Sequence, residues 1–164
     1  MKLTPSQEFA KQLIINNKYT VITGDRQVGK STLLLEITKQ WLNGNTLNIE
    51  DLILVYPSQI IADTFELEFK QKFKFINTIH FVQGIENVKK LHLYTGKKIG
   101  IFIDDADHPY GSKIPDIINH KNVQKFVMTG VINEKNNEGF FSDIVKTCQM
   151  SEWCTPVFKH YNLV

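Results

Sequence analysis

The residues best suited to chemistry in this chain of 164 residues lie in one short loop, 24–31, with the sequence GDRQVGKS. Its spacing is G-x-x-x-x-G-K-S, and the two glycines permit a tight turn whose backbone N–H groups can face phosphate oxygens. The ammonium group of Lys30 can reach the β- and γ-phosphates of a nucleotide, and the hydroxyl of Ser31 can bind Mg²⁺. The candidate phosphate-binding residues are Gly24, Asp25, Arg26, Gln27, Val28, Gly29, Lys30, Ser31 and Thr32.

The segments on either side of this loop match the context that phosphate binding requires. Residues 19–23, YTVIT, predict an apolar strand, and residues 30–42 carry leucine, isoleucine and tryptophan at helical spacing. A helix that starts at Lys30 would present its positive N-terminal end to the phosphates. The alternative, a glycine-containing turn with a solvated lysine, is disfavoured by this strand–loop–helix arrangement.

A second candidate site follows the apolar run 98–103, KIGIFI, which predicts a strand buried on both faces. Asp104 and Asp105 come directly after it, and in parallel α/β sheets ligands bind outside the carboxyl ends of the strands. Asp104 would hold Mg²⁺, mainly through its water shell, although it can also be an N-cap of the following turn. Asp105 would orient the attacking water. ATPases with a phosphate loop and a strand of this kind mostly have glutamate at this position. Because aspartate is shorter, ATP hydrolysis is expected to be slow or to use a second water. Asp107 and His108 are expected to be solvated loop residues.

Strand and helix patterns alternate along the chain, which predicts an α/β fold with a mostly parallel sheet covered by helices on both faces. There is no internal repeat or low-complexity segment, so residues 1–164 are expected to form one domain. Helices are expected at 6–16, 30–42 and 58–70, with shorter helical stretches at 114–119 and 140–146. Strands are expected at 19–23, 52–56, 98–103 and 125–129, with candidate strands at 73–76 and 155–161, while 81–92 stays ambiguous.

The composition is that of a soluble globular protein, with 42% hydrophobic and 22% charged residues. The net charge of +2 gives no broad electrostatic case for nucleic-acid binding, and Lys70, Lys72 and Lys74 are better explained as a solvated edge than as a phosphate track. Cys148 and Cys154 lack a usual zinc spacing and are expected to be reduced thiols of an intracellular protein. With no signal peptide and no apolar run of membrane-spanning length, the protein is expected to be cytoplasmic and to have no membrane partner.

Several stretches resemble, in order, the large terminase subunits that package DNA into the heads of tailed phages. The loop RQVGKS is similar to their R-Q-x-G-K-[ST] loop. LTPSQ at 3–7 is similar to their upstream glutamine motif, and VYPSQIIADTF at 55–65 to the segment after their second strand. FIDDAD at 102–107 resembles their hydrophobic Asp-Glu strand, and FVMTGVINEKNNEGFFSDI at 126–144 resembles their coupling segment.

This resemblance implies a three-layer P-loop NTPase fold of the RecA-like, additional-strand class, which binds ATP and Mg²⁺. The roles that it implies are catalysis for Lys30, Asp105 and Arg26, Mg²⁺ binding for Ser31 and Asp104, coupling of hydrolysis to movement for Thr129 and Gly130, and adenine contact for Gln7. The alternatives that stay open are a solvent-facing Arg26, a Gln7 exposed in the first turn of a helix, a simple strand-ending turn at Thr129 and Gly130, and a core position for Phe140 and Phe141.

The favoured hypothesis is an ATPase module of a motor that translocates or packages double-stranded DNA, in the host cytoplasm if the source is viral. A homo-oligomer or a partner subunit is expected to complete the ATP site, and no terminase nuclease domain is evident. The alternatives are the first domain of a helicase-like DNA-dependent ATPase, a slow nucleotide-dependent switch, and a small-molecule kinase. Strand order discriminates among them: the 125–129 strand between the 19–23 and 98–103 strands supports the motor class, whereas direct adjacency of those two favours kinases and GTPases.

Overall fold

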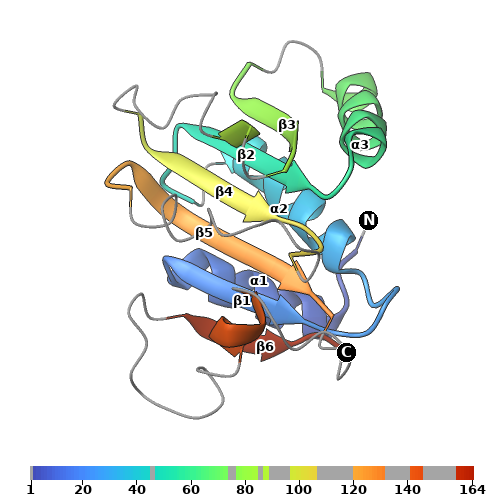
Figure 1. Cartoon of the computed structure of the whole chain (residues 1–164), viewed down its shortest axis with the longest axis vertical. Helices are drawn as coiled ribbons and strands as arrows, with labels where there is room; N and C mark the ends of the chain where they lie inside the picture. Colours follow the sequence, from blue (N-terminus) through green and yellow to red (C-terminus); the bar gives the residue numbers. More distant parts are fainter. Residues whose placement is uncertain are drawn as a thin grey trace.

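The computed structural model describes residues 2–44, 47–73, 77–84, 87–88, 97–106, 120–131, 141–145 and 158–164. The described residues form six strands, three long helices and short helical segments at 87–88 and 141–145 (Figure 1). The strands are β1 (Tyr19–Thr23), β2 (Asp51–Tyr56), β3 (Ile79–Gln83), β4 (Ile99–Ile103), β5 (Val123–Gly130) and β6 (Lys159–Asn162). The long helices are α1 (Pro5–Asn16), α2 (Lys30–Gly44) and α3 (Gln59–Lys72).

The six strands form one sheet in the order β3-β2-β4-β5-β1-β6, and every neighbouring pair is parallel. β5 lies between β1 and β4, which confirms the additional-strand arrangement rather than direct adjacency of the other two. The register pairs Thr23 of β1 with Gly130 of β5, and Ile103 of β4 with Met128 of β5. The carboxyl ends of these strands therefore meet at one edge of the sheet, where the loop after β1 and the two aspartates after β4 come together.

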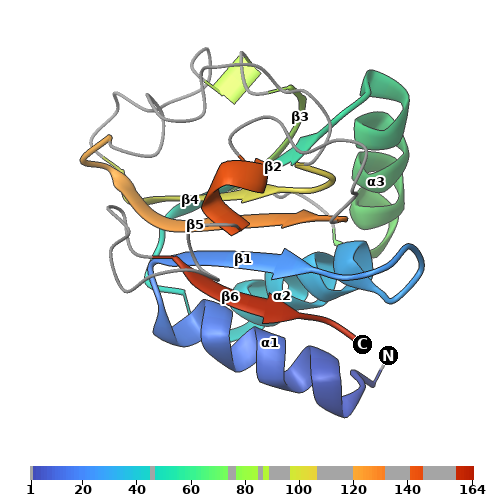
Figure 2. The same ribbon diagram turned by 60° about the horizontal axis from the view of Figure 1, so that its bottom comes forward.

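The two faces of the sheet are covered by different elements. Ile22, Leu54 and Phe102 pack in the layer that contains α1, α2 and α3, whereas Ile101 and Met128 pack in the opposite layer with segment 141–145. Figure 2 shows α1 and α2 on one side of the sheet and that segment on the other.

The handedness of the connections explains this division. The connections through α2 and α3 both run toward the β3 edge, so right-handed crossovers place both helices on one face. The connection that contains 141–145 runs from β5 toward β6 at the other edge, and the same rule places it on the opposite face. The predicted α/β fold is confirmed, with the long helices gathered on a single face.

The two ends of α3 are each set by a local cap. Ser58 caps the helix by accepting a hydrogen bond from the backbone N–H of Ile61, close to the predicted start. Phe73 is the C-cap: its N–H donates to the carbonyl of Phe69, and the two rings stack with their centroids 4.7 Å apart. Phe73 itself is the helix cap and not a strand residue, and the rest of the candidate strand at 73–76 lies outside the described residues.

Other predictions fall at the edges of the described chain. β3 begins at Ile79, ahead of the ambiguous stretch, and the last strand begins at Lys159, later than predicted. The predictions made for Lys74, Asp107, His108, 114–119, Phe140, Cys148 and Cys154 lie outside the described residues. In the described part of the chain, no helix has the length and apolar character needed to cross a membrane.

Lys125 ties β5 to the end of α1 from inside the protein. Its side chain is buried, and its ammonium group donates to the carbonyl oxygens of Ile14, Ile15 and Asn17 at 2.6, 3.0 and 2.7 Å. These carbonyls belong to the C-terminal turn of α1 and the residue after it, where backbone acceptors lack intrahelical partners and the helix dipole favours a cation. Burial lowers the pKa of Lys125 to about 8, so the group is still mostly charged at pH 7.

We expect Lys125→Met to lower the free energy of unfolding by about 1–3 kcal/mol, because it leaves buried carbonyl oxygens without donors while it keeps a similar volume. Lys70→Met is the matched control, since Lys70 is exposed on α3, where it pairs with Glu66; its effect should stay within about 0.5 kcal/mol. Urea unfolding at pH 7 measures both. Equal effects of the two substitutions would show that the buried contact contributes little.

Candidate functional site

The phosphate loop, residues 24–31, connects β1 directly to α2. At Gly24 an added Cβ would lie 2.8 Å from the carbonyl oxygen of Leu163 and 2.9 Å from Cγ2 of Val28, so no larger residue fits there. Lys30 is buried, and its ammonium group donates to the carbonyl oxygens of Gly24 and Asp25, each at 2.7 Å. The lysine therefore folds back over the loop, where its charge lies beside the backbone that would surround a phosphate.

Ser31, Asp104 and Thr129 form a chain of hydrogen bonds between three elements. The Ser31 hydroxyl donates to Oδ2 of Asp104 at 2.5 Å, and the Thr129 hydroxyl donates to Oδ1 of the same carboxylate at 2.7 Å. Asp104 and Thr129 are both buried, so these bonds are shielded from water. The first turn of α2, the end of β4 and the end of β5 are thus joined through one carboxylate.

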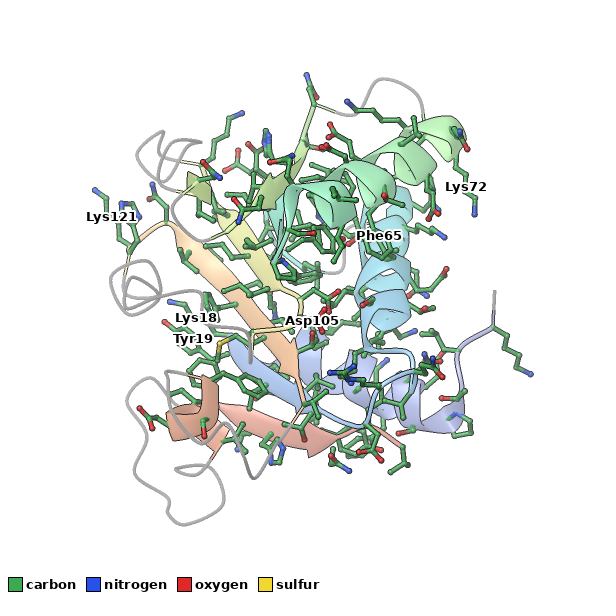
Figure 3. All side chains as sticks on the ribbon, turned by 45° about the vertical axis from the view of Figure 1, so that its right-hand side comes forward. Lys18, Tyr19, Phe65, Lys72, Asp105 and Lys121 are labelled. Carbon is green, nitrogen blue, oxygen red and sulfur yellow. The ribbon has the colours of Figure 1, made fainter. Side chains whose placement is uncertain are left out.

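Asp105 follows in an uncommon backbone conformation. Its φ is +52°, in the left-handed region, and its backbone N–H lies 3.4 Å from the hydroxyl oxygen of Thr129. Asp and Asn tolerate this region better than longer residues, because their short polar side chains can bond locally. The conformation gives a physical reason for aspartate where glutamate is usual. Figure 3 shows Asp105 at the carboxyl ends of the strands, with Lys18, Tyr19 and Lys121 at the opposite end.

A cleft of about 510 Å³ opens between the two motifs, a size suited to a small-molecule ligand. It is lined by Arg26, Gln27, Gly29, Lys30, Ser31, Thr32, Asp105 and Val131. The structure thus brings together the loop residues and Asp105, which are far apart in the sequence. Arg26 and Gln27 are exposed at its rim. Gln27 has a φ of +67°, so Gln27 and Asp105, two residues in the left-handed region, both line the cleft.

Val131 was missed by the sequence analysis, although it directly follows the predicted coupling pair. Thr129 and Gly130 are the last two residues of β5 and pair with β1 in the sheet rather than forming a turn. The hydroxyl of Thr129 donates to Asp104, so a movement of that carboxylate would alter the hydrogen bond of Thr129. Phe141 is buried in the core, as its simpler interpretation predicts.

Gln7 lies behind the loop rather than in the lining of the cleft. It is 6% exposed, which excludes the interpretation as an exposed residue in the first turn of a helix. Its side-chain Nε2 donates to the carbonyl oxygen of Gly29 at 3.1 Å, and its Oε1 accepts from the backbone N–H of Thr4 at 2.9 Å. Contact of Gln7 with adenine stays a prediction.

The start of the loop is also anchored by β6, a feature with no signal in the sequence. The Thr23 hydroxyl donates to Oδ1 of Asn162 at 2.9 Å and lies 2.8 Å from Nε2 of His160. Because that hydroxyl proton is already used, Nε2 of His160 must be the donor in this pair, which a neutral imidazole can be. The N–H of Leu163 donates to the Thr23 carbonyl at 2.7 Å, so β6 holds the residue directly before the loop.

Acidification should lower the free energy of unfolding through His160, because a charged ring is disfavoured at this buried position even though its Nε2 still donates to Thr23. Burial lowers the pKa of His160 below its ordinary value of 6.5, so the folded protein binds this proton less readily than the unfolded chain. The contribution to stability is therefore complete above pH 6.5 and declines as the pH falls below it. Urea unfolding at about pH 5 and pH 7.5 should show a smaller acid loss for His160→Gln than for the wild type. An unchanged pH dependence would contradict this account.

The donor set is suited to Mg²⁺. The hydroxyl of Ser31 and the carboxylate of Asp104 are hard oxygen ligands within hydrogen-bond distance of one another, at the N-terminus of α2. Mg²⁺ commonly uses one or two carboxylates together with phosphate oxygens and water. Among the described residues there is no group of three or more His, Cys, Asp or Glu side chains that could hold a metal without such help.

The strand order, the loop and the paired aspartates define a P-loop NTPase of the additional-strand class. A family described as an AAA domain matches residues 16–138, which is more than half of the sequence, and the chain belongs to that family. The family is one of nucleotide-binding P-loop domains, and the match does not distinguish terminases from other members of that class. No curated protein sequence matches the chain.

Proposed function

We propose that this protein binds ATP with Mg²⁺ and hydrolyses it. The observation that carries the proposal is the cleft in which Lys30 and Ser31 of the phosphate loop meet Asp105, directly beside the buried carboxylate of Asp104. A lysine, a hydroxyl and two carboxylates in this arrangement are the groups that phosphoryl transfer needs, because its catalysis consists mostly of positioning and charge neutralisation.

Each side chain has a distinct task in the proposed reaction. Lys30 exchanges the carbonyls of Gly24 and Asp25 for phosphate oxygens and neutralises charge that builds on the transferred group. Ser31 and Asp104 would hold Mg²⁺, which would supply positive charge to offset the negative charge that develops on the phosphates. Asp105 orients the attacking water, and Arg26 at the rim senses the γ-phosphate.

Coupling to movement would start at Thr129. Its hydroxyl donates to the carboxylate of Asp104, and its carbonyl accepts a hydrogen bond from the N–H of Ala106 at 2.7 Å. Thr129 therefore contacts the residues on both sides of Asp105. Loss of the γ-phosphate would alter the contacts of Asp104 and reach β5 through this residue. Movement of β5 would then be passed to β1 and β4, its neighbours in the sheet.

We further propose that the protein is a motor module that acts on double-stranded DNA. A second copy of the chain in a homo-oligomer, or a different partner subunit, would complete the ATP site. The strand order supports the motor class, and the resemblance to terminases supports DNA as the load. A slow nucleotide-dependent switch is the second candidate, and the short Asp105 in its left-handed conformation favours it.

The test is Mg²⁺-dependent ATP hydrolysis by the purified chain, with and without double-stranded DNA, beside Lys30→Ala. Turnover that DNA stimulates and the substitution removes would support the motor. Tight ATP binding with no turnover in either condition would support the switch. Equal, low signals from the wild type and Lys30→Ala in both binding and hydrolysis would refute the proposal.

A further inference from the structure

The side chain of Gln7 connects the first turn of α1 to the phosphate loop. Gln7 takes part in a reciprocal cap in which the Thr4 hydroxyl accepts from the Gln7 backbone N–H and Oε1 of Gln7 accepts from the Thr4 backbone N–H. The other end of the same amide, Nε2, donates to the carbonyl of Gly29. Both polar ends of this buried amide are therefore engaged, one in the helix cap and one in the loop.

Gly29 is shaped to receive this contact. Its φ is +92°, and an added Cβ would clash with Nε2 of Gln7, so only glycine fits. Its carbonyl also accepts the N–H of Leu33 at 2.9 Å, which is the hydrogen bond that opens α2. The Gly29 carbonyl is consequently held from two sides, by α1 and by α2.

Holding that carbonyl sets the direction of the next N–H. The planar trans peptide joins the Gly29 carbonyl to the Lys30 N–H and points the two in opposite directions. The Lys30 N–H is thus aimed away from Gln7 and Leu33, toward the N-terminal end of α2. That end of a helix attracts anions, and Gly29 and Lys30 both line the cleft there.

We propose that Gln7 is a positioning residue that holds the Gly29–Lys30 peptide in its triphosphate-binding conformation, whatever base the nucleotide carries. This inference rests on the proposed nucleotide-binding function. It differs from the adenine contact implied by the resemblance to terminases, because Gln7 would have to give up the helix cap or the loop contact to reach a base. The effect of Gln7 is therefore on affinity for the triphosphate and not on the choice between ATP and GTP.

The test compares the full chain with Gln7→Met and Thr4→Ala. Gln7→Met keeps length and adds no charge but removes the donor to Gly29, whereas Thr4→Ala weakens the same helix cap and leaves that donor in place. Dissociation constants for Mg²⁺–ATP, Mg²⁺–GTP and inorganic tripolyphosphate are measured by calorimetry, with thermal midpoints recorded beside them. We expect Gln7→Met to weaken all three ligands by roughly tenfold and by the same factor. Thr4→Ala should lower the thermal midpoint but leave the three constants unchanged.

Three results would overturn the inference. Weaker binding of ATP alone, with tripolyphosphate unaffected, would assign Gln7 to adenine. Equal weakening by Thr4→Ala would reduce its role to stabilising α1, and no weakening by Gln7→Met would remove the role altogether. In each of these the wild type still binds nucleotide, so the proposed function survives; a wild type that binds none of the three ligands would overturn both.

Discussion

Lys30→Ala is expected to reduce ATP hydrolysis by at least about a hundredfold, because it removes the buried cation that, in the proposed reaction, neutralises charge on the transferred phosphoryl group. The same ammonium group donates to two loop carbonyls, those of Gly24 and Asp25, so its loss also removes a contact that shapes the loop. Affinity for ATP should fall as well, since the lysine would contact phosphate in the ground state. Steady-state hydrolysis and calorimetric titration measure the two effects separately.

The matched control for this prediction is Lys39→Ala on the same helix. Lys39 pairs with Glu36 at 3.1 Å, and it does not line the cleft. Its substitution should leave turnover and ATP affinity within about twofold of the wild type, because a partly exposed ion pair contributes little. If both alanine variants lost activity to the same degree, the loss would reflect the stability of α2 rather than chemistry at Lys30.

Asp105→Asn is expected to lower turnover by about a hundredfold or more while the dissociation constant for ATP changes little. Asparagine occupies the left-handed region about as readily as aspartate, so the backbone at φ +52° should be preserved and only the charge is lost. Single-turnover hydrolysis, with ATP binding measured in parallel, separates chemistry from affinity. Asp63→Asn on the exposed face of α3 is the control and should change neither quantity.

Asp105→Glu then distinguishes the motor from the switch. Glutamate has the reach that such ATPases usually use, but the left-handed backbone costs it more than aspartate, by roughly 1 kcal/mol. A large rise in turnover despite that strain would indicate that aspartate keeps hydrolysis slow, as a switch requires. A fall in turnover would indicate that the turn after β4 is built around the shorter side chain. Unchanged turnover of Asp105→Asn would remove Asp105 from catalysis.

The local parts of this protein could be predicted from sequence because short-range chemistry determines them. The phosphate loop needs its glycines, lysine and serine within eight consecutive positions, so the motif predicts both the turn and the start of α2. The apolar run that ends in Asp104 and Asp105 likewise predicts a buried strand with carboxylates at its end. Alternating patterns predicted the α/β class, and the strand order agreed with the additional-strand class that the resemblance implied.

The tertiary structure alone decided the features that depend on contacts between distant segments. Gln7 bonds to Gly29, Lys125 bonds to the end of α1, and Thr23 bonds to His160. No pattern of neighbouring residues predicts any of these pairs. The left-handed backbone of Asp105 is likewise set by its surroundings at the end of β4 rather than by its own propensity. Sequence patterns report what a residue does to its neighbours in the chain, whereas buried polar partners are chosen by how the sheet and helices pack. The residue types of the candidate site could therefore be read from the sequence, and the geometry that holds the site in place was decided only by the fold.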